Sequence, residues 1–179
     1  MSGAFAGEGL RRVMRYVPSP VTVITFFSND EPRWMTIGSF TSVSVDPPLI
    51  LFNVDRQSGS HDAINEAPRF TVNILAEDQA AIGQHFATSG LDSEEQFAPI
   101  ELMDAERLII DGTVASLHCE TTARHRAGDS TIIVARVLEG SGYDGRRPLL
   151  YHNRTYRSLG ESMEVSLFAP VNRASKETP

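Results

Sequence analysis

Short apolar and β-branched runs alternate with polar turn residues along most of the chain. In order, these runs are "VTVITFF" from Val21 to Phe27, "MTIGSFTSVS", "LILFNV", "FTVNIL" from Phe70 to Leu75, "RLII", "TVASLHCETT", "STIIVARVLE" and "LLYHNRTYRSL". Gly, Asp, Asn or Pro separates most of them. Because β-branched and aromatic residues favour strands while the separating residues favour turns, the pattern predicts many short β-strands.

Helical spacing is confined to three segments. From Glu8 to Tyr16 the apolar residues fall on one face of a helix, and Pro18 and Pro20 end it. The second segment is "SHDAINEA", for which Ser60 is expected to be the N-cap, and the third is "EDQAAIGQHFA" from Glu77 to Ala87. Many short strands with few short helices predict a mostly β protein, a closed or nearly closed antiparallel barrel.

The chain length of 179 residues suits one globular domain, which we place at residues 1–160. Residues 161–179 show no clear period and end in the polar stretch "NRASKETP". We expect this segment to be a C-terminal arm or a disordered tail.

The segment "MTIGSFTSVSVDPPLILFNV", from Met35 to Val54, is rich in hydroxyl side chains. They belong to Thr36, Ser39, Thr41, Ser42 and Ser44. In an extended strand the side chains alternate between two faces, and here neither face is purely apolar. Two interpretations stay open: an edge strand whose hydroxyls face water, or a strand whose hydroxyls and peptide groups bind a polar ligand.

A second polar cluster follows in "DRQSGSHDAI". It places Arg56, Ser58 and Ser60 directly before a predicted helix. A cation, two hydroxyls and a helix N-terminus are a plausible local site for a phosphate group. Helix capping by Ser60 is the simpler interpretation, and the two do not exclude each other.

Composition narrows the classes of function. A net charge of −7 and a pI near 5.2 disfavour a nucleic-acid partner held by counterion release. No apolar stretch reaches the roughly 20 residues that span a bilayer, so we expect no membrane partner. The single cysteine, Cys119, excludes an internal disulfide and fits a cytoplasmic protein, and it is expected to be a small buried hydrophobe.

Several local motifs do not indicate a binding or catalytic site. "GSGYDG", from Gly140 to Gly145, matches a dinucleotide-binding pattern, but no helix follows it, so we interpret it as a turn between strands. "NRT", from Asn153 to Thr155, is interpreted as a hairpin turn. The five histidines and Cys119 show no ligand spacing of the structural-zinc kind, and we predict no metal site.

Seven blocks in order resemble the short-chain flavin reductases, which have an FMN-binding split-barrel fold. The blocks are "PSPVTVITF", "MTIGSFTSVSVDPPLILFNV", "FTVNILAEDQ", "HFA", "DGTVASLHCE", "GDSTIIVARV" and "PLLYHNRTYRSL". The resemblance covers roughly residues 9–160. It implies a homodimer that binds FMN or FAD, is reduced by NADH or NADPH, and supplies a flavin-dependent monooxygenase with diffusible reduced flavin.

The resemblance also implies which residues form the site. Ser39, Thr41 and Ser42 would line the isoalloxazine and ribityl groups, with Met35 and Thr36 near the ring. Arg56, Ser58 and Ser60 would meet the phosphate, and Phe86 would lie close to the flavin. For Trp34, the only tryptophan, two positions stay open: over the flavin pocket or at the dimer interface.

One block departs from the family pattern. Where the family commonly has "GDH", this chain has "GDS", so Asp129 and Ser130 are the predicted catalytic residues. Ser130 can donate a hydrogen bond but cannot supply the surface or the cationic form of an imidazole. His125 and His152 are the alternatives for that role, and the preference for NADH or NADPH stays open.

Three functions are compatible with these residues. The first is an NAD(P)H-dependent flavin reductase that transfers hydride from a nicotinamide to flavin N5, chemistry that needs orientation more than an acid–base pair. The second is a flavoprotein that retains FMN and reduces or oxidises another substrate. The third is a flavin carrier with no catalysis of its own.

Overall fold

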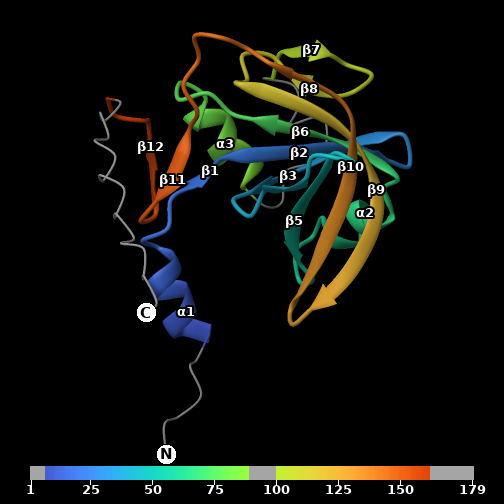
Figure 1. The fold of residues 1–179 in the computed structure, drawn as a ribbon, viewed down its shortest axis with the longest axis horizontal. Coiled ribbons are helices and arrows are strands. Elements are labelled where there is room, and N and C mark those ends of the chain that lie inside the picture. The colour runs from blue at the N-terminus through green and yellow to red at the C-terminus, as the bar shows by residue number, and fades with distance from the viewer. Residues whose placement is uncertain (1–6, 89–99, 162–179) are drawn as a thin grey trace, which may run out of the picture.

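The computed structural model describes residues 7–88 and 100–161 (Figure 1). Three helices occur there: α1 (Gly7–Met14), α2 (His61–Glu66) and α3 (Ala80–Phe86). The strands are β1 (Ser19–Pro20), β2 (Thr22–Ser28), β3 (Glu31–Ile37), β4 (Thr41–Ser44), β5 (Leu49–Asp55), β6 (Arg69–Ile74), β7 (Leu102–Asp104), β8 (Ile109–Ile110), β9 (Ala115–Ala127), β10 (Ser130–Gly142), β11 (Leu150–His152) and β12 (Thr155–Arg157). Of the predicted tail at 161–179, all but the first residue lies outside the described residues.

A seven-stranded antiparallel sheet dominates the structure, in the order β3-β2-β6-β9-β10-β5-β4. Its two edge strands, β3 and β4, are consecutive in the chain. Close to this junction the Ser39 hydroxyl accepts a hydrogen bond from the Asn53 N–H at 2.9 Å and donates one to the Asn53 carbonyl at 3.3 Å. The sheet therefore curls back toward itself, and the mostly β, antiparallel fold predicted from the sequence is confirmed.

Tight turns join the hairpins, as the turn residues predict. Asn29 and Asp30 both have positive φ, 54° and 62°, between β2 and β3, and Asn153 and Arg154 have 48° and 63° between β11 and β12. Two positive φ angles are the property of a type I′ turn, whose twist matches the flanking strands. The interpretation of "NRT" as a hairpin turn is confirmed.

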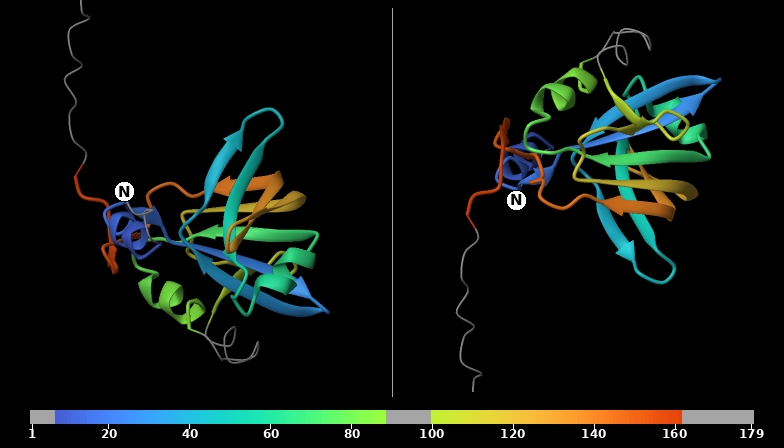
Figure 2. Two further views of the ribbon diagram at one scale, coloured as in Figure 1. Left: turned by 90° about the horizontal axis from the view of Figure 1, so that it is seen from below. Right: turned by 90° about the horizontal axis from the view of Figure 1, so that it is seen from above.

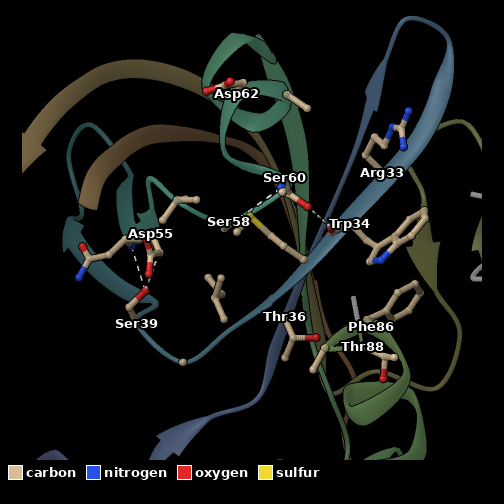
Figure 3. Close-up of a pocket in the computed structure, with 18 of the residues that line it drawn as sticks. Arg33, Trp34, Thr36, Ser39, Asp55, Ser58, Ser60, Asp62, Phe86 and Thr88 are labelled. Carbon is tan, nitrogen blue, oxygen red and sulfur yellow. Dashed lines mark hydrogen bonds between the residues drawn. The ribbon is translucent and has the colours of Figure 1, made fainter. Parts of the chain in front are cut away.

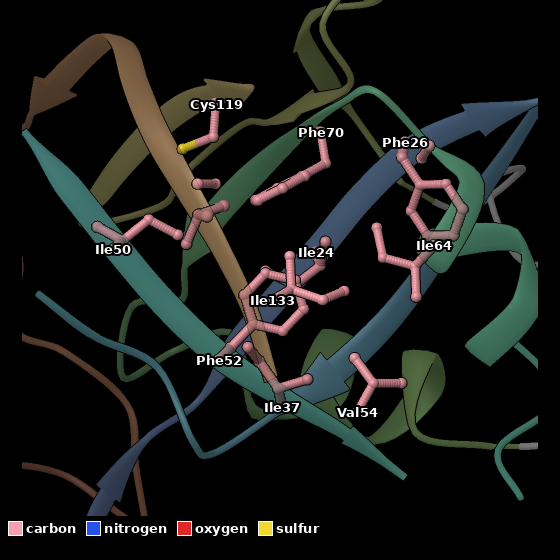
Figure 4. Packing of buried hydrophobic residues seen from close by; sticks show 13 residues of the cluster. Ile24, Phe26, Ile37, Ile50, Phe52, Val54, Ile64, Phe70, Cys119 and Ile133 are labelled. Carbon is pink, nitrogen blue, oxygen red and sulfur yellow. The ribbon is translucent and has the colours of Figure 1, made fainter. Parts of the chain in front are cut away.

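The main core lies inside the curled sheet (Figure 4). Its side chains come from β2, β3, β5, β6, β9 and β10, and from α2, which contributes Ile64 with 0% exposure. Phe52 and Phe70 meet edge to face, with ring centroids 5.3 Å apart. Burying each such side chain contributes roughly 1.5–3 kcal/mol.

Cys119 belongs to this core and is fully buried. Burial raises the pKa of its thiol to about 12, so the thiolate does not form near neutral pH. The prediction that Cys119 is a small buried hydrophobe is confirmed.

A second apolar cluster fixes α3 beside the sheet. It contains Val21, Val23, Trp34, Leu75, Phe86, Ile110 and Leu149. Gly83 makes the close approach of α3 possible, because a Cβ there would lie 3.1 Å from Val21 Cγ1 and 3.4 Å from Leu75 Cδ1. The end of α3 is thereby held against β3, where the principal cavity forms.

Several predicted boundaries differ from the structure, including the first helix, which ends at Met14, and "GSGYDG", whose first three residues end β10. Two further differences bear on the site. The run "MTIGSFTSVS" is not one strand, because β3 ends at Ile37 and β4 begins at Thr41. The predicted alternation of faces does not continue through the intervening turn. The third helix begins at Ala80 and not at Glu77, because Gln79, with φ −96° and ψ 22°, has left helical geometry and is the N-cap.

Helix α1 stands apart from the seven-stranded sheet, next to the small sheet β1-β11-β12 (Figures 1 and 2). The predicted amphipathic pattern is present, but the apolar residues Leu10, Val13, Met14 and Val17 are 49–53% exposed. No helix within residues 7–88 and 100–161 has the length and apolar character needed to cross a bilayer.

Candidate functional site

The principal cavity, of about 860 Å3, lies between β3, the end of β5 with its loop into α2, and the end of α3 (Figure 3). Of the residues predicted for the site, six line it: Met35, Thr36, Ser39, Ser58, Ser60 and Phe86. Residues far apart in the sequence thus meet around one space. The predicted residues that do not line it are Thr41, Ser42, Arg56, Asp129 and Ser130.

Trp34 and Phe86 form an aromatic wall of the cavity. Their ring centroids are 5.7 Å apart at 43°, and both side chains are at least nine-tenths buried in the second apolar cluster. Of the two positions left open for Trp34, the structure places it at the pocket. A rigid aromatic surface of this kind can pack against a planar ring.

The loop from β5 into α2 forms the opposite, polar wall. The Ser60 N–H donates to Ser58 Oγ at 3.3 Å, and Ser60 Oγ donates to the Trp34 carbonyl at 3.2 Å. Ser60 is the N-cap residue of α2, as predicted, but its hydroxyl makes no capping hydrogen bond to the helix. The hydroxyl instead ties the loop to β3 beside the aromatic wall.

Ser39 and Thr36 both line the cavity through hydroxyls that already have backbone partners. Ser39 exchanges hydrogen bonds with the backbone of Asn53, which sequence reasoning did not select. Thr36 Oγ1 donates to the Gly83 carbonyl at 3.2 Å. A hydroxyl oxygen has two lone pairs, so Thr36 can still accept a hydrogen bond from a ligand.

Arg33 is the basic side chain that lines the cavity within the described part of the chain. Its side chain is 43% exposed, and its guanidinium bonds the Glu31 carboxylate at 2.9 Å. Arg33 and Met35 are two residues apart on β3, so their side chains point to the same face. Trp34 and Thr36, on the other face of β3, line the cavity as well, so this alternation does not single out Arg33 in the sequence. The predicted cation, Arg56, is exposed and does not line the cavity.

Thr41 and Ser42 are exposed on the edge strand β4. Thr41 Oγ1 donates to the neighbouring Ser42 carbonyl at 3.4 Å, within its own strand. The break between β3 and β4 carries these hydroxyls away from the cavity. For this part of the segment, the structure favours the interpretation of an edge strand with hydroxyls facing water.

Asp129 and Ser130 lie at the tip of the β9–β10 hairpin, whose turn contains Gly128 with φ 63°. Ser130 Oγ donates to Asp129 Oδ1 at 3.3 Å, and Ser130 pairs across the sheet with Asp55. Because Asp55 lines the cavity, the hairpin tip is one strand away from its wall. His125, on the same hairpin, is exposed.

Carboxylates also border the cavity. Asp55 Oδ1 accepts a hydrogen bond from the Gln57 N–H at 2.8 Å, and Asp62 Oδ1 lies 2.8 Å from His61 Nδ1. Neither was selected from the sequence. Among residues 7–88 and 100–161, no group of three or more His, Cys, Asp and Glu side chains is arranged to hold a metal ion.

Comparison with known proteins identifies the family. The flavin reductase-like domain model matches residues 14–160, and the chain belongs to this family. It is 35% identical over 143 residues to the FMN reductase (NADH) SmoA of Agrobacterium fabrum, covering 80% of this chain and 81% of the relative. It is 32% identical over 154 residues to the reductase component of the FADH(2)-dependent resorcinol hydroxylase of a Rhizobium species, covering 84% and 86%.

Comparison with solved structures supports the same family. The structure of the NADH:FAD oxidoreductase SgcE6 of Streptomyces globisporus superposes with a TM-score of 0.81 at 32% identity, covering 91% of this chain and 98% of that one. The split-barrel fold implied by the seven sequence blocks is therefore confirmed.

Proposed function

We propose that this protein is an NAD(P)H:flavin oxidoreductase that reduces FMN or FAD and supplies the reduced flavin to a separate monooxygenase. The observation that carries the proposal is the cavity between β3, the β5–α2 loop and α3, in a chain that belongs to the flavin reductase-like family. Relatives with NADH-dependent FMN and FAD reductase activity, and reductase components of monooxygenases, support it.

The residues around the cavity fit a flavin. The aromatic wall of Trp34 and Phe86 suits a planar ring system, and the opposite wall offers the hydroxyls of Ser58 and Ser60. Gly59 lies between these serines, and a Cβ there would meet nothing within 4 Å, so the loop backbone is open to a ligand. Arg33 supplies a positive charge for a phosphate group.

The role of the protein's residues is therefore to bind the flavin and the nicotinamide donor and to orient them for hydride transfer. A flavin bound there would supply the redox chemistry of the reaction, as the acceptor of hydride from a nicotinamide. Trp34, Phe86 and Met35 exclude water from one wall, while Ser58, Ser60 and Arg33 hold the polar end of the ligand. Asp129 and Ser130, one strand away, act on the nicotinamide side in this proposal.

The exposed face of α1 supports a homodimer. Leu10, Val13 and Met14 of α1, with Val17 three residues beyond its end, are apolar and about half exposed. Because an apolar helical face gains stability when it is covered, we assign it to a second copy of the chain. We also retain residues 1–160 as the flavin reductase domain, and the reducing cytoplasm as the compartment, which suits the free thiol of Cys119.

An anaerobic absorbance assay tests the reductase function. Purified protein is mixed with excess FMN or FAD, NADH or NADPH is added, and the visible flavin absorbance is followed. Catalytic bleaching of many equivalents supports the proposal. Bleaching of one protein-bound equivalent only, with the yellow colour retained through purification, identifies a flavoprotein with a resident flavin instead. Flavin binding without bleaching identifies a carrier.

A further inference from the structure

A second, smaller cavity of about 190 Å3 adjoins the principal cavity. It lies between β1, the end of β3, the residue after α3 and the β11–β12 hairpin. Four residues line both cavities: Thr36, Ile37, Gly38 and Ala87. The two spaces therefore open on the same stretch of β3, and one extended ligand can reach both.

Two tyrosines form an aromatic shelf in the smaller cavity. Tyr151 and Tyr156 are cross-strand partners in the β11–β12 hairpin, with ring centroids 5.4 Å apart at 64°. Tyr156 is partly buried against the second apolar cluster, whereas Tyr151 is 42% exposed. Burial, and then the nearby Tyr151, raises the pKa of Tyr156, so its hydroxyl keeps its proton near neutral pH. The shelf thus offers one anchored ring and one accessible ring.

Gly38 lies where the two cavities meet, and the lack of a side chain there lets Ser19 approach closely. A Cβ at this position would lie 2.8 Å from Ser19 Oγ, closer than non-bonded atoms approach. The rest of the smaller cavity is mostly apolar, with Pro20, Val21 and Ala87 beside the tyrosines. Apolar walls with an aromatic face and a few hydroxyls suit a planar heteroaromatic ring.

We propose that the smaller cavity binds the adenine ring of a dinucleotide whose reacting half occupies the principal cavity. FAD and NAD(P)H share this chemistry, since each joins an adenosine to its redox-active half through a pyrophosphate. FMN lacks the adenosine and fills the principal cavity alone. The inference rests on the proposed flavin reductase function and adds the subsite that distinguishes dinucleotides from mononucleotides.

The test compares dinucleotides with their mononucleotide counterparts. Dissociation constants for FAD and FMN are measured by flavin fluorescence titration, and Michaelis constants are measured for NADH and for reduced nicotinamide mononucleotide. In Tyr151→Ala we expect the FAD-to-FMN affinity ratio, or the corresponding NADH ratio, to fall about tenfold, the scale of one lost aromatic stacking contact. Tyr151→Phe keeps the ring and should keep the ratio. Tyr143→Ala is the matched control, because Tyr143 follows β10 and lines neither cavity.

The outcomes distinguish an adenine subsite for FAD, an adenine subsite for NADH, and no such subsite. A loss confined to FAD assigns the subsite to the flavin, and a loss confined to NADH assigns it to the hydride donor. Equal changes for dinucleotides and mononucleotides in a folded variant overturn the proposal. Competition by AMP against FAD or NADH, but not against FMN, gives a second test on the unmodified protein, and its absence for both dinucleotides also overturns the proposal. Failure of the unmodified protein to bind or bleach FMN refutes the reductase function instead.

Discussion

The backbone N–H of Arg56 donates a hydrogen bond to the carbonyl oxygen of Asp129 at 3.0 Å. This bond joins the loop after β5, which carries Ser58 and Ser60, to the tip of the β9–β10 hairpin, which carries Ser130. The predicted phosphate-binding loop and the predicted nicotinamide block are therefore neighbours in the fold, even though 73 residues, from 56 to 129, separate them in the sequence.

This neighbourhood leads to a prediction for Ser130→His. An imidazole is longer than the serine hydroxymethyl group and can reach from the hairpin tip toward the cavity wall at Asp55. We expect a lower Michaelis constant for NADH, by a few-fold, and an unchanged dissociation constant for FMN. Ser141→His, an exposed position on the same strand, is the control. Donor kinetics identical in both variants would remove Ser130 from the hydride site.

Removing the charge of Arg33 or of Arg56 shows which of the two binds the flavin phosphate. Of the two, only Arg33 lines the cavity, so Arg33→Gln should weaken FMN binding by about 1 kcal/mol, or about fivefold. The value is kept low because the Arg33 side chain is 43% exposed. Riboflavin, which lacks the phosphate, should bind both proteins equally. Arg56→Gln is the matched control. A larger effect from Arg56→Gln would return the phosphate contact to the residue first predicted from the sequence.

The hydroxyls of β4 and those of the β5–α2 loop should contribute differently to the affinity for flavin. Ser58 lines the cavity, so Ser58→Ala should weaken flavin binding by about 1 kcal/mol, the usual value of one hydrogen bond. Thr41 and Ser42 are exposed on β4 and outside the cavity, so the double alanine variant should bind flavin normally. Isothermal titration with FMN measures both. Weaker binding in the double variant alone would place the flavin against β4.

The sequence was most informative where local chemistry decides the structure. The turn at Asn153, the buried Cys119 and the mostly antiparallel sheet follow from turn preference and β-propensity, which act over a few residues. The break between β3 and β4 was missed because residues 38–40 contain no proline, and the bonds of Ser39 to Asn53 that bend the chain there come from a distant strand.

The site was predictable only in part for the same reason. Six of the predicted residues line the cavity because they lie on β3, in the β5–α2 loop or at the end of α3. Arg33 and Asn53 were missed because their proximity depends on the curl of the sheet and not on a local motif. Arg56 was selected for its position beside two serines, but its side chain is exposed.

His118 should make the stability depend on pH. Burial, followed by the charges of Arg107 and Arg69, lowers its pKa below the ordinary value of 6.5. Thr71 Oγ1 donates its proton to the Arg107 carbonyl at 2.6 Å, so it accepts from His118 Nδ1, which therefore carries the imidazole proton. Below pH 6.5 the unfolded chain takes up a proton that the folded protein resists.

The free energy of unfolding should therefore be fully retained above pH 6.5 and fall as the pH drops toward the lower, folded-state pKa. His118→Asn keeps a donor for Thr71 but cannot titrate, so it should flatten this part of the profile. Urea unfolding between about pH 7.5 and pH 5 measures the effect. The control His125→Asn, at an exposed position, should follow the unmodified protein. Parallel profiles for His118→Asn and the unmodified protein would contradict the assignment.

The central claim is that flavin binds in the cavity between β3, the β5–α2 loop and α3. A crystal structure of the protein with FMN tests it most directly. We predict the isoalloxazine ring in this cavity, with Trp34 and Phe86 in its wall and the phosphate within reach of Ser58 and Arg33. A flavin bound elsewhere, for example in a third cavity of about 330 Å3 that Arg69, Arg107 and His118 line, would contradict the account.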